Sequence, residues 1–156
     1  MKHVFLTLTT FLLAVSCTQN VQQSGSSDSP GSTEMSDPLK DGIFIHITES
    51  YDDPHRLLMP LKMATLMADD KDVLVYMDIH AVKILVEGSA DIELEGFEPA
   101  HTYLKSLIEK NIGIYACPTC LKVAGYTPEE LMEGIDVARK DRFFDFTEGK
   151  ILTIDY

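Results

Sequence analysis

The chain has 156 residues, 45% of them hydrophobic, and a formal net charge of −12 that comes from 25 acidic and 13 basic side chains. Nucleic acids and anionic lipid surfaces are themselves negatively charged, so this acidity argues against either as a binding partner. The length allows one domain with a single hydrophobic core once an N-terminal segment of about forty residues is set aside.

Residues 1–16 have the layout of a secretory signal peptide, because Lys2 gives a positive start and residues 4–15 are mostly apolar but too few to span a membrane. The run ends in Leu-Ala-Val-Ser-Cys, similar to a bacterial lipobox, in which the signal is removed before the cysteine and the cysteine is lipidated. We therefore predict a lipoprotein signal peptide over 1–16 and a lipid on Cys17. The protein would then be anchored in the bacterial cell envelope, on the periplasmic side or the cell surface. An ordinary signal peptide cut nearby is the alternative.

Residues 17–40 are rich in Ser, Gln, Gly and Pro and almost free of large apolar side chains. Such a segment cannot bury enough surface to offset the entropy lost on ordering, so we predict a lipid-anchored flexible linker. The folded domain is expected over 41–156. Removal of Lys2 with the signal peptide would bring the net charge of the mature chain to −13.

Short apolar runs alternate with helical patterns along this domain. Asp52, Asp53 and Pro54 form a helix start with an aspartate N-cap, and Pro60 is expected to kink this helix or delay its start. The predicted elements are strands at 42–48, 73–77, 112–116, 134–137 and 151–154, and helices after Asp53, at 99–110 and at 140–146.

Strands that alternate with helices indicate an α/β fold, with about five strands in a mainly parallel sheet and helices on both faces. Residues 82–86 do not fit this alternation, since they suit a short strand or a loop wall. Their apolar side chains have no obvious partner inside a five-stranded domain, so we expect an exposed patch that forms a subunit interface. An additional edge strand in a monomer is the alternative.

Cys117 directly follows an apolar β-type run, and Cys120 comes three residues later. The pattern predicts a strand, the cysteine and then a helical turn that breaks at Gly125. Backbone N–H groups at a helix start favour the nucleophilic thiolate, and Cys-X-X-Cys spacing also lowers a cysteine pKa. We therefore predict that Cys117 is a reactive sulfur that can form a disulfide with Cys120. Two half-buried structural thiols are the alternative.

The carboxyl ends of parallel strands meet at one edge of a sheet, where ligands of α/β proteins bind. Cys117 is expected at this edge with Thr48, Asp78 and His80. His80 is a candidate base or cationic neighbour of the thiolate, with a solvated loop histidine as the alternative. His46, within the first strand, is expected to be a hydrogen-bonded core side chain. His55 is a weaker candidate near the edge, and His101 is expected to be exposed on a helix.

We predict no cofactor and no metal. The sequence has no Gly-X-Gly-X-X-Gly, phosphate-binding loop or Gly-X-Ser-X-Gly motif. A structural zinc needs four ligands, and with no second cysteine pair two histidines would have to join Cys117 and Cys120. The methionines at helical spacing are expected to fill the core rather than bind copper: Met59, Met63 and Met67.

Over nearly all of residues 42–156 the chain resembles the DsrE/DsrF-like family, which includes the TusD-type sulfur relay proteins. The resemblance is carried by the opening strand Gly-Ile-Phe-Ile-His and by Asp-Asp-Pro-His-Arg before an apolar helix. It is also carried by Asp-Val-Leu-Val-Tyr-Met-Asp, by the Ile-Tyr-Ala-Cys turn with Gly125 eight residues after Cys117, and by the terminal Lys-Ile-Leu-Thr-Ile-Asp-Tyr.

The resemblance implies a DsrE-like fold, a persulfide on Cys117, transfer of sulfane sulfur from donor to acceptor proteins, and a homo-oligomer that is a trimer or a hexamer. Two features depart from the family pattern. The relay proteins are cytoplasmic, whereas this chain carries an export signal, and Cys120 adds a second thiol that a one-cysteine relay does not need.

Two classes of function follow. In the first, an envelope-anchored sulfurtransferase or sulfur carrier binds or transfers sulfane sulfur on Cys117, and Cys120 acts as the resolving thiol. Its partners would be sulfur donor and acceptor proteins or low-molecular-weight persulfides, with the membrane reached through Cys17. In the second, a non-catalytic envelope binding or assembly module keeps Cys117 and Cys120 as a structural pair. A general thiol–disulfide oxidoreductase is a third possibility, close to the first in chemistry.

Overall fold

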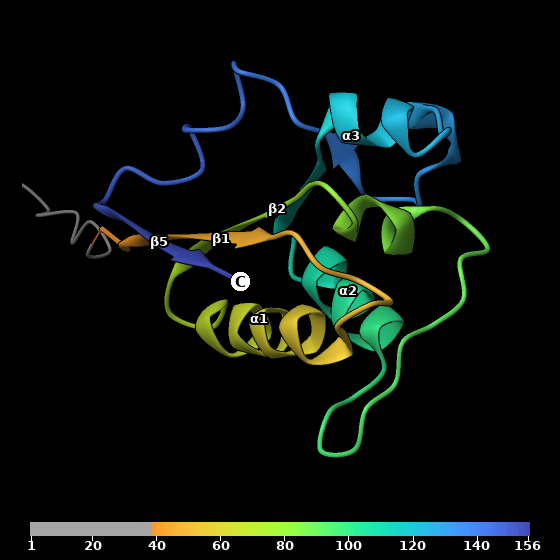
Figure 1. The fold of residues 1–156 in the computed structure, drawn as a ribbon. Helices are drawn as coiled ribbons and strands as arrows, with labels where there is room; N and C mark the ends of the chain where they lie inside the picture. The colour runs from red at the N-terminus through yellow and green to blue at the C-terminus, as the bar shows by residue number, and fades with distance from the viewer. Residues whose placement is uncertain (1–38) are drawn as a thin grey trace, which may run out of the picture. The chain divides into compact units, whose positions relative to one another are not determined.

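Strands and helices alternate along residues 39–156, which are the residues that the computed structural model describes. In chain order the elements are β1 (Gly42–Ile47), α1 (Pro54–Met67), β2 (Asp72–Met77), the 3-10 helix η1 (Ala81–Leu85), α2 (Ala100–Glu109), β3 (Gly113–Ala116), α3 (Pro118–Val123), the 3-10 helix η2 (Pro128–Glu130), β4 (Asp136–Val137) and β5 (Ile151–Asp155). The strands form one parallel sheet in the order β4-β3-β2-β1-β5 (Figure 1). The predicted five-stranded α/β fold is confirmed.

The predicted signal peptide, the lipidation site at Cys17 and the linker up to residue 38 lie outside the described residues. Within residues 39–156, no helix combines the length and apolar character needed to cross a bilayer.

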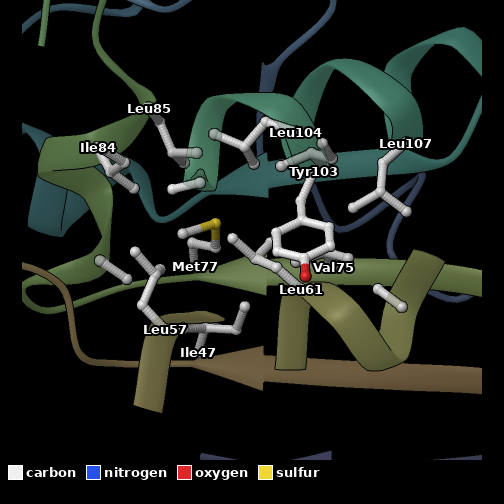
Figure 2. Close-up of a cluster of buried hydrophobic side chains, with 14 of the residues drawn as sticks. Ile47, Leu57, Leu61, Val75, Met77, Ile84, Leu85, Tyr103, Leu104 and Leu107 are labelled. Carbon is white, nitrogen blue, oxygen red and sulfur yellow. The ribbon is translucent and has the colours of Figure 1, made fainter. Parts of the chain in front are cut away.

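The main hydrophobic core lies on one face of the sheet, because side chains of a strand alternate between its two faces. The register of β1 and β2 sets two buried rows side by side on this face: Ile43, Ile45 and Ile47 next to Val73, Val75 and Met77. α1 and α2 pack on this face and on each other (Figure 2), and the leucines they bury include Leu57, Leu61, Leu104 and Leu107. Each fully buried leucine stabilises the fold by about 1.5–3 kcal/mol.

α1 begins where the sequence predicts. The Asp53 carboxylate accepts a hydrogen bond from the Arg56 backbone N–H at 3.2 Å, and Pro54 occupies the first helical position. A proline is tolerated there because its missing N–H would have no helical partner. Pro60 lies buried inside α1 and does not delay its start.

The opposite face of the sheet is crossed by residues 138–150. This crossing follows from the strand order, since β4 and β5 lie at opposite edges of the sheet. The ring of Phe143 packs on it against Phe44 of β1 at 5.2 Å between centroids, Tyr76 of β2 at 5.0 Å and Tyr115 of β3 at 6.5 Å.

The predicted helix at 140–146 is wrong, because these residues form turns and bends. Seven residues are too few to form a stable helix unless an apolar stripe packs along it. Here the chain is held by the single inserted ring of Phe143 and by a hydrogen bond from the Thr147 hydroxyl to the Lys40 carbonyl at 3.0 Å. Irregular chain therefore covers the second face, where the sequence predicts a helix.

The predicted exposed patch at 82–86 is also wrong. Ala81–Leu85 form η1, and Val82, Ile84 and Leu85 are fully buried in the main core. Two hydrogen bonds fix the start of η1, because the N–H groups of His80 and Ala81 both donate to the Thr48 carbonyl. The segment thus turns inward directly after β2 and provides no exposed interface.

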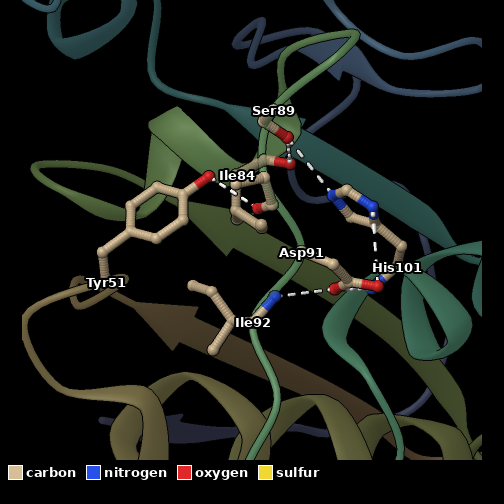
Figure 3. Close-up of polar contacts among 7 residues, drawn as sticks. Tyr51, Ile84, Ser89, Asp91, Ile92 and His101 are labelled. Carbon is tan, nitrogen blue, oxygen red and sulfur yellow. Dashed lines mark hydrogen bonds and ion pairs between the residues drawn. The ribbon is translucent and has the colours of Figure 1, made fainter.

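Polar contacts fasten the loop between η1 and α2 (Figure 3). The Ser89 hydroxyl donates to the Ile84 carbonyl at 3.0 Å and lies 3.2 Å from Nε2 of His101, while Asp91 Oδ1 accepts from the His101 backbone N–H at 3.0 Å. His101, expected to be exposed, is thus partly buried by this loop. The Asp91 Oδ2 to His101 Nδ1 distance is 3.7 Å, which is longer than a hydrogen bond.

Candidate functional site

Cys117 lies at the carboxyl end of β3, where the chain passes into α3. Its backbone N–H donates to the Met77 carbonyl at 2.9 Å, which ties the cysteine to the end of the neighbouring strand β2. Cys117 is the N-cap of α3, and its Sγ accepts a hydrogen bond from the Cys120 backbone N–H at 3.4 Å. Gly125 follows the helix with a φ of +88°, which glycine adopts without strain. The predicted strand, cysteine and helical turn are present.

The surroundings of Cys117 favour its thiolate. Burial raises the pKa of the thiol, but hydrogen bonds from the Tyr76 hydroxyl and from Cys120 outweigh it, so the pKa of Cys117 is lowered. The pKa of Tyr76 is raised, chiefly by burial and then by its hydrogen bond to Cys117. The Tyr76 hydroxyl therefore stays protonated at neutral pH and can donate a hydrogen bond to the thiolate.

Cys120 has the opposite character. Burial raises its pKa, and the neighbouring Cys117 and the charge of Asp78 add to this effect against a lowering hydrogen bond from the Ile79 backbone. Ile79 has a φ of +47°, a left-handed conformation that is strained for a β-branched residue. Both cysteines are half-buried free thiols in the structure.

Two cavities border α3, and each contains one of the sulfurs. The Cys117 cavity has a volume of about 410 Å³ and is lined by Cys117, Pro118, Thr119, Tyr76, Ala138, Arg139, Lys140, Phe143 and Phe144. The Cys120 cavity has a volume of about 500 Å³ and is lined by Cys120, Ile79, His80, Lys83, Val123 and Ala124. The pair can therefore be approached from two sides.

A larger cavity of about 750 Å³ follows α2 and includes Ser89, His101 and Leu104. No cysteine lines it, and its polar groups are engaged in the contacts that fasten the loop. We assign the candidate site to the smaller Cys117 cavity because that cavity contains a sulfur whose thiolate is stabilised.

The other predicted edge residues lie around this centre in different roles. His80 is exposed and lines the Cys120 cavity rather than the Cys117 cavity. Thr48 donates its hydroxyl to the Tyr156 carbonyl at 3.1 Å, and its own carbonyl anchors the start of η1. These contacts make Thr48 a structural residue and leave His80 as a neighbour of Cys120.

His46 bridges two carboxylates at the ends of the strands. Its Nδ1 lies in hydrogen-bond contact with Asp155 Oδ1 at 3.1 Å, as expected, but the side chain is partly exposed and does not lie in the core. Its Nε2 lies 3.0 Å from Asp78 Oδ1, within ion-pair distance but without the alignment of a hydrogen bond. The His46 ring also stacks on the Tyr76 ring, with 5.4 Å between centroids. His46 therefore packs against the residue whose hydroxyl donates a hydrogen bond to Cys117.

His55, the weaker histidine candidate, packs its ring on Phe97 at 5.4 Å and lies at the start of α1. Within residues 39–156, no three side chains of His, Cys, Asp or Glu converge in a way that would hold a metal ion.

Sequence reasoning missed the residues that complete the cavity: Tyr76, Arg139, Lys140 and Phe143. Tyr76 had a signal, because it alternates with the buried Val75 and Met77 and so faces the other side of the sheet. The other three had none, since their place depends on how residues 138–150 cross that face.

The DsrE/DsrF-like family model matches residues 41–148. The ychN protein from E. coli, in its crystal structure, is 20% identical, with a TM-score of 0.57 over 75% of this chain and 100% of that protein. MTH1491 from Methanobacterium thermoautotrophicum, a protein of unknown function, is 21% identical, with a TM-score of 0.53 over 72% of this chain and 98% of that protein. At these identities the likeness shows the fold alone. None of the curated proteins matches the sequence.

Proposed function

Because the chain belongs to the DsrE/DsrF-like family, whose fold is of the sulfur-relay type, we propose that it is an envelope-anchored sulfur-handling protein. In this proposal Cys117 carries sulfane sulfur as a persulfide. The observation that supports it most strongly is the thiolate-stabilising site itself: Sγ of Cys117 accepts the Cys120 N–H, and the cavity in front of it opens to solvent-exposed residues.

Loading proceeds by nucleophilic attack. The Cys117 thiolate attacks the outer sulfur of a donor persulfide, the new Sγ–S bond forms, and the donor leaves as a thiolate. Cys117 is thereby oxidised to the persulfide level and the donor is reduced to a thiol. The lowered pKa of Cys117 supplies the nucleophile near neutral pH.

Unloading has two routes. A thiolate of an acceptor protein can attack the outer sulfur and take it as its own persulfide. Alternatively, the Cys120 thiolate attacks Sγ of Cys117, which forms the Cys117–Cys120 disulfide and releases hydrosulfide. The second route then requires a dithiol reductant to regenerate both thiols. The raised pKa of Cys120 suits this later role, because it keeps Cys120 protonated while Cys117 is loaded.

The envelope location rests on the N-terminal sequence, with Cys17 as the lipidated residue and residues 17–40 as the tether.

A trimer or hexamer rests on family resemblance alone, because the apolar segment expected to form the interface is buried. Light scattering of the purified full-length chain in detergent tests this assembly, and the mass of a single chain per particle would refute it.

The experiment for the proposed function is mass spectrometry of the full-length chain after exposure to inorganic polysulfide. A gain of about 32 Da, one sulfur atom, is expected on the tryptic peptide 111–122, which contains both cysteines. Cys120→Ala should retain the adduct and Cys117→Ala should lose it. A disulfide in the wild type together with no adduct in Cys120→Ala, which cannot form that disulfide, would favour the oxidoreductase alternative. Unreactive thiols would favour the structural one.

A further inference from the structure

One wall of the Cys117 cavity consists of cationic and aromatic side chains from residues 139–144. The wall is anchored at both ends. The Ala138 N–H donates to the Ala116 carbonyl at 2.8 Å, directly beside Cys117, and the Phe143 ring packs edge-on against Tyr76 at 5.0 Å between centroids. Arg139 and Lys140 are therefore held next to the sulfur.

The charge of this wall is unusual for the chain. Acidic residues outnumber basic ones by 25 to 13 over the whole sequence, yet the cavity lining contains Arg139 and Lys140 and no carboxylate. Arg139 is partly neutralised, because its guanidinium contacts the Asp141 carboxylate at 3.2 Å. For Lys140, no carboxylate of residues 39–156 lies within 4.0 Å of the ammonium group. The excess positive charge thus lies on Lys140.

Building on the proposed function, we propose that this wall selects an anionic low-molecular-weight persulfide as the sulfur donor. The anionic group of the donor, a carboxylate for example, would lie at Lys140 and Arg139, its carbon chain would lie against Phe143, and its outer sulfur would meet Cys117. A cavity of about 410 Å³ falls within the range of small-molecule sites, roughly 300–1,000 Å³. A strongly acidic chain otherwise repels anions, so a local cation is needed to admit one.

Sulfur transfer from this donor is a single displacement. The Cys117 thiolate forms a bond to the outer sulfur of the donor, the sulfur–sulfur bond of the donor breaks, and the organic thiolate leaves with the electron pair.

The test compares two donors of similar size on the full-length chain: the persulfide of 3-mercaptopropionate, which carries a carboxylate, and that of 2-mercaptoethanol, which carries a neutral hydroxyl. Sulfur transfer is timed by mass spectrometry of the tryptic peptide that contains Cys117, in the wild type and in Lys140→Glu. This peptide is 111–122 in both chains and 111–139 in a chain that lacks Lys122. The matched control is Lys122→Glu, which makes the same charge change at an exposed position of α3 outside the cavity lining.

We expect Lys140→Glu to slow the anionic donor by about five-fold, the size of one exposed charge pair, and to leave the neutral donor unchanged. Lys122→Glu should affect neither, and added salt should remove the preference of the wild type. Equal rates for both donors in every variant would overturn this inference while leaving the sulfur-carrying role intact. Absence of transfer from either donor to the wild type would overturn both.

Discussion

The Cys120 backbone N–H donates to Sγ of Cys117 across 3.4 Å, so the second cysteine of the pair stabilises the thiolate of the first. The same proximity acts in the opposite direction on Cys120, whose pKa is raised by burial and by Cys117. The two sulfurs are therefore unequal, and Cys117 is the one prepared to attack first.

This inequality predicts the order of alkylation. In Cys120→Ala, iodoacetamide should modify Cys117 faster at neutral pH than it modifies Cys120 in Cys117→Ala. The backbone N–H at position 120 survives the first substitution, so much of the stabilisation remains. Each rate should rise with pH as the thiol ionises, with the lower midpoint for Cys117. Faster modification of Cys120 at neutral pH would reverse the assigned roles.

Tyr76→Phe should slow alkylation of Cys117 several-fold at neutral pH, because it removes the hydroxyl that donates to the thiolate and so raises the pKa of Cys117. The matched control is Tyr115→Phe, on the adjacent strand and with a ring that also packs near Phe143. Tyr115 does not line the Cys117 cavity, so removing its hydroxyl should leave the rate of Cys117 alkylation unchanged. The same rate for Tyr76→Phe and the wild type would show that the hydroxyl does not act on the sulfur.

The burial of η1 predicts a large loss of stability on truncation. Ile84→Ala should lower the free energy of unfolding by about 2–4 kcal/mol, because it leaves a cavity in the core. Val123→Ala, at a side chain that is 83% exposed, should change it by less than about 0.5 kcal/mol. Urea denaturation measures both. A negligible loss for Ile84→Ala would show that the segment is at the surface after all.

The sequence was a good guide to elements with a local signal. The N-cap at Asp53, the alternating rows on β1 and β2, and the turn from β3 through Cys117 into α3 all depend on neighbouring residues. Residues 82–86 were misjudged because their apolar pattern is equally compatible with a surface patch and a buried turn. Only the anchoring of η1 to Thr48, more than thirty residues earlier, decides between them.

The candidate site could be predicted in part for the same reason. Cys117 and Cys120 share one local turn, whereas Tyr76 joins them only because β2 pairs with β3. Arg139 and Lys140 join through the crossing of residues 138–150 to the far edge of the sheet. That crossing contains turns in place of the predicted helix, so no periodic pattern marks which side chains reach the sulfur.

The N-terminal sequence predicts membrane attachment through Cys17. Cys17→Ser should leave the signal peptide uncleaved or release the chain from the membrane, because the modified cysteine bears the lipid. Fractionation and the mass of the mature chain in its bacterial host measure this change, with Cys120→Ser as the control for loss of a thiol. Unchanged processing and membrane association in Cys17→Ser would contradict the lipoprotein assignment.

The central claim is that Cys117 carries transferable sulfane sulfur, and cyanolysis tests it most directly. The full-length Cys120→Ser chain, loaded with polysulfide and freed of excess reagent, should release about one thiocyanate per chain, since cyanide removes only the outer sulfur of a persulfide. Cys117→Ser, treated in the same way, should release none. Equal amounts of thiocyanate from both variants, or none from either, would contradict the assignment of Cys117 as the sulfur carrier.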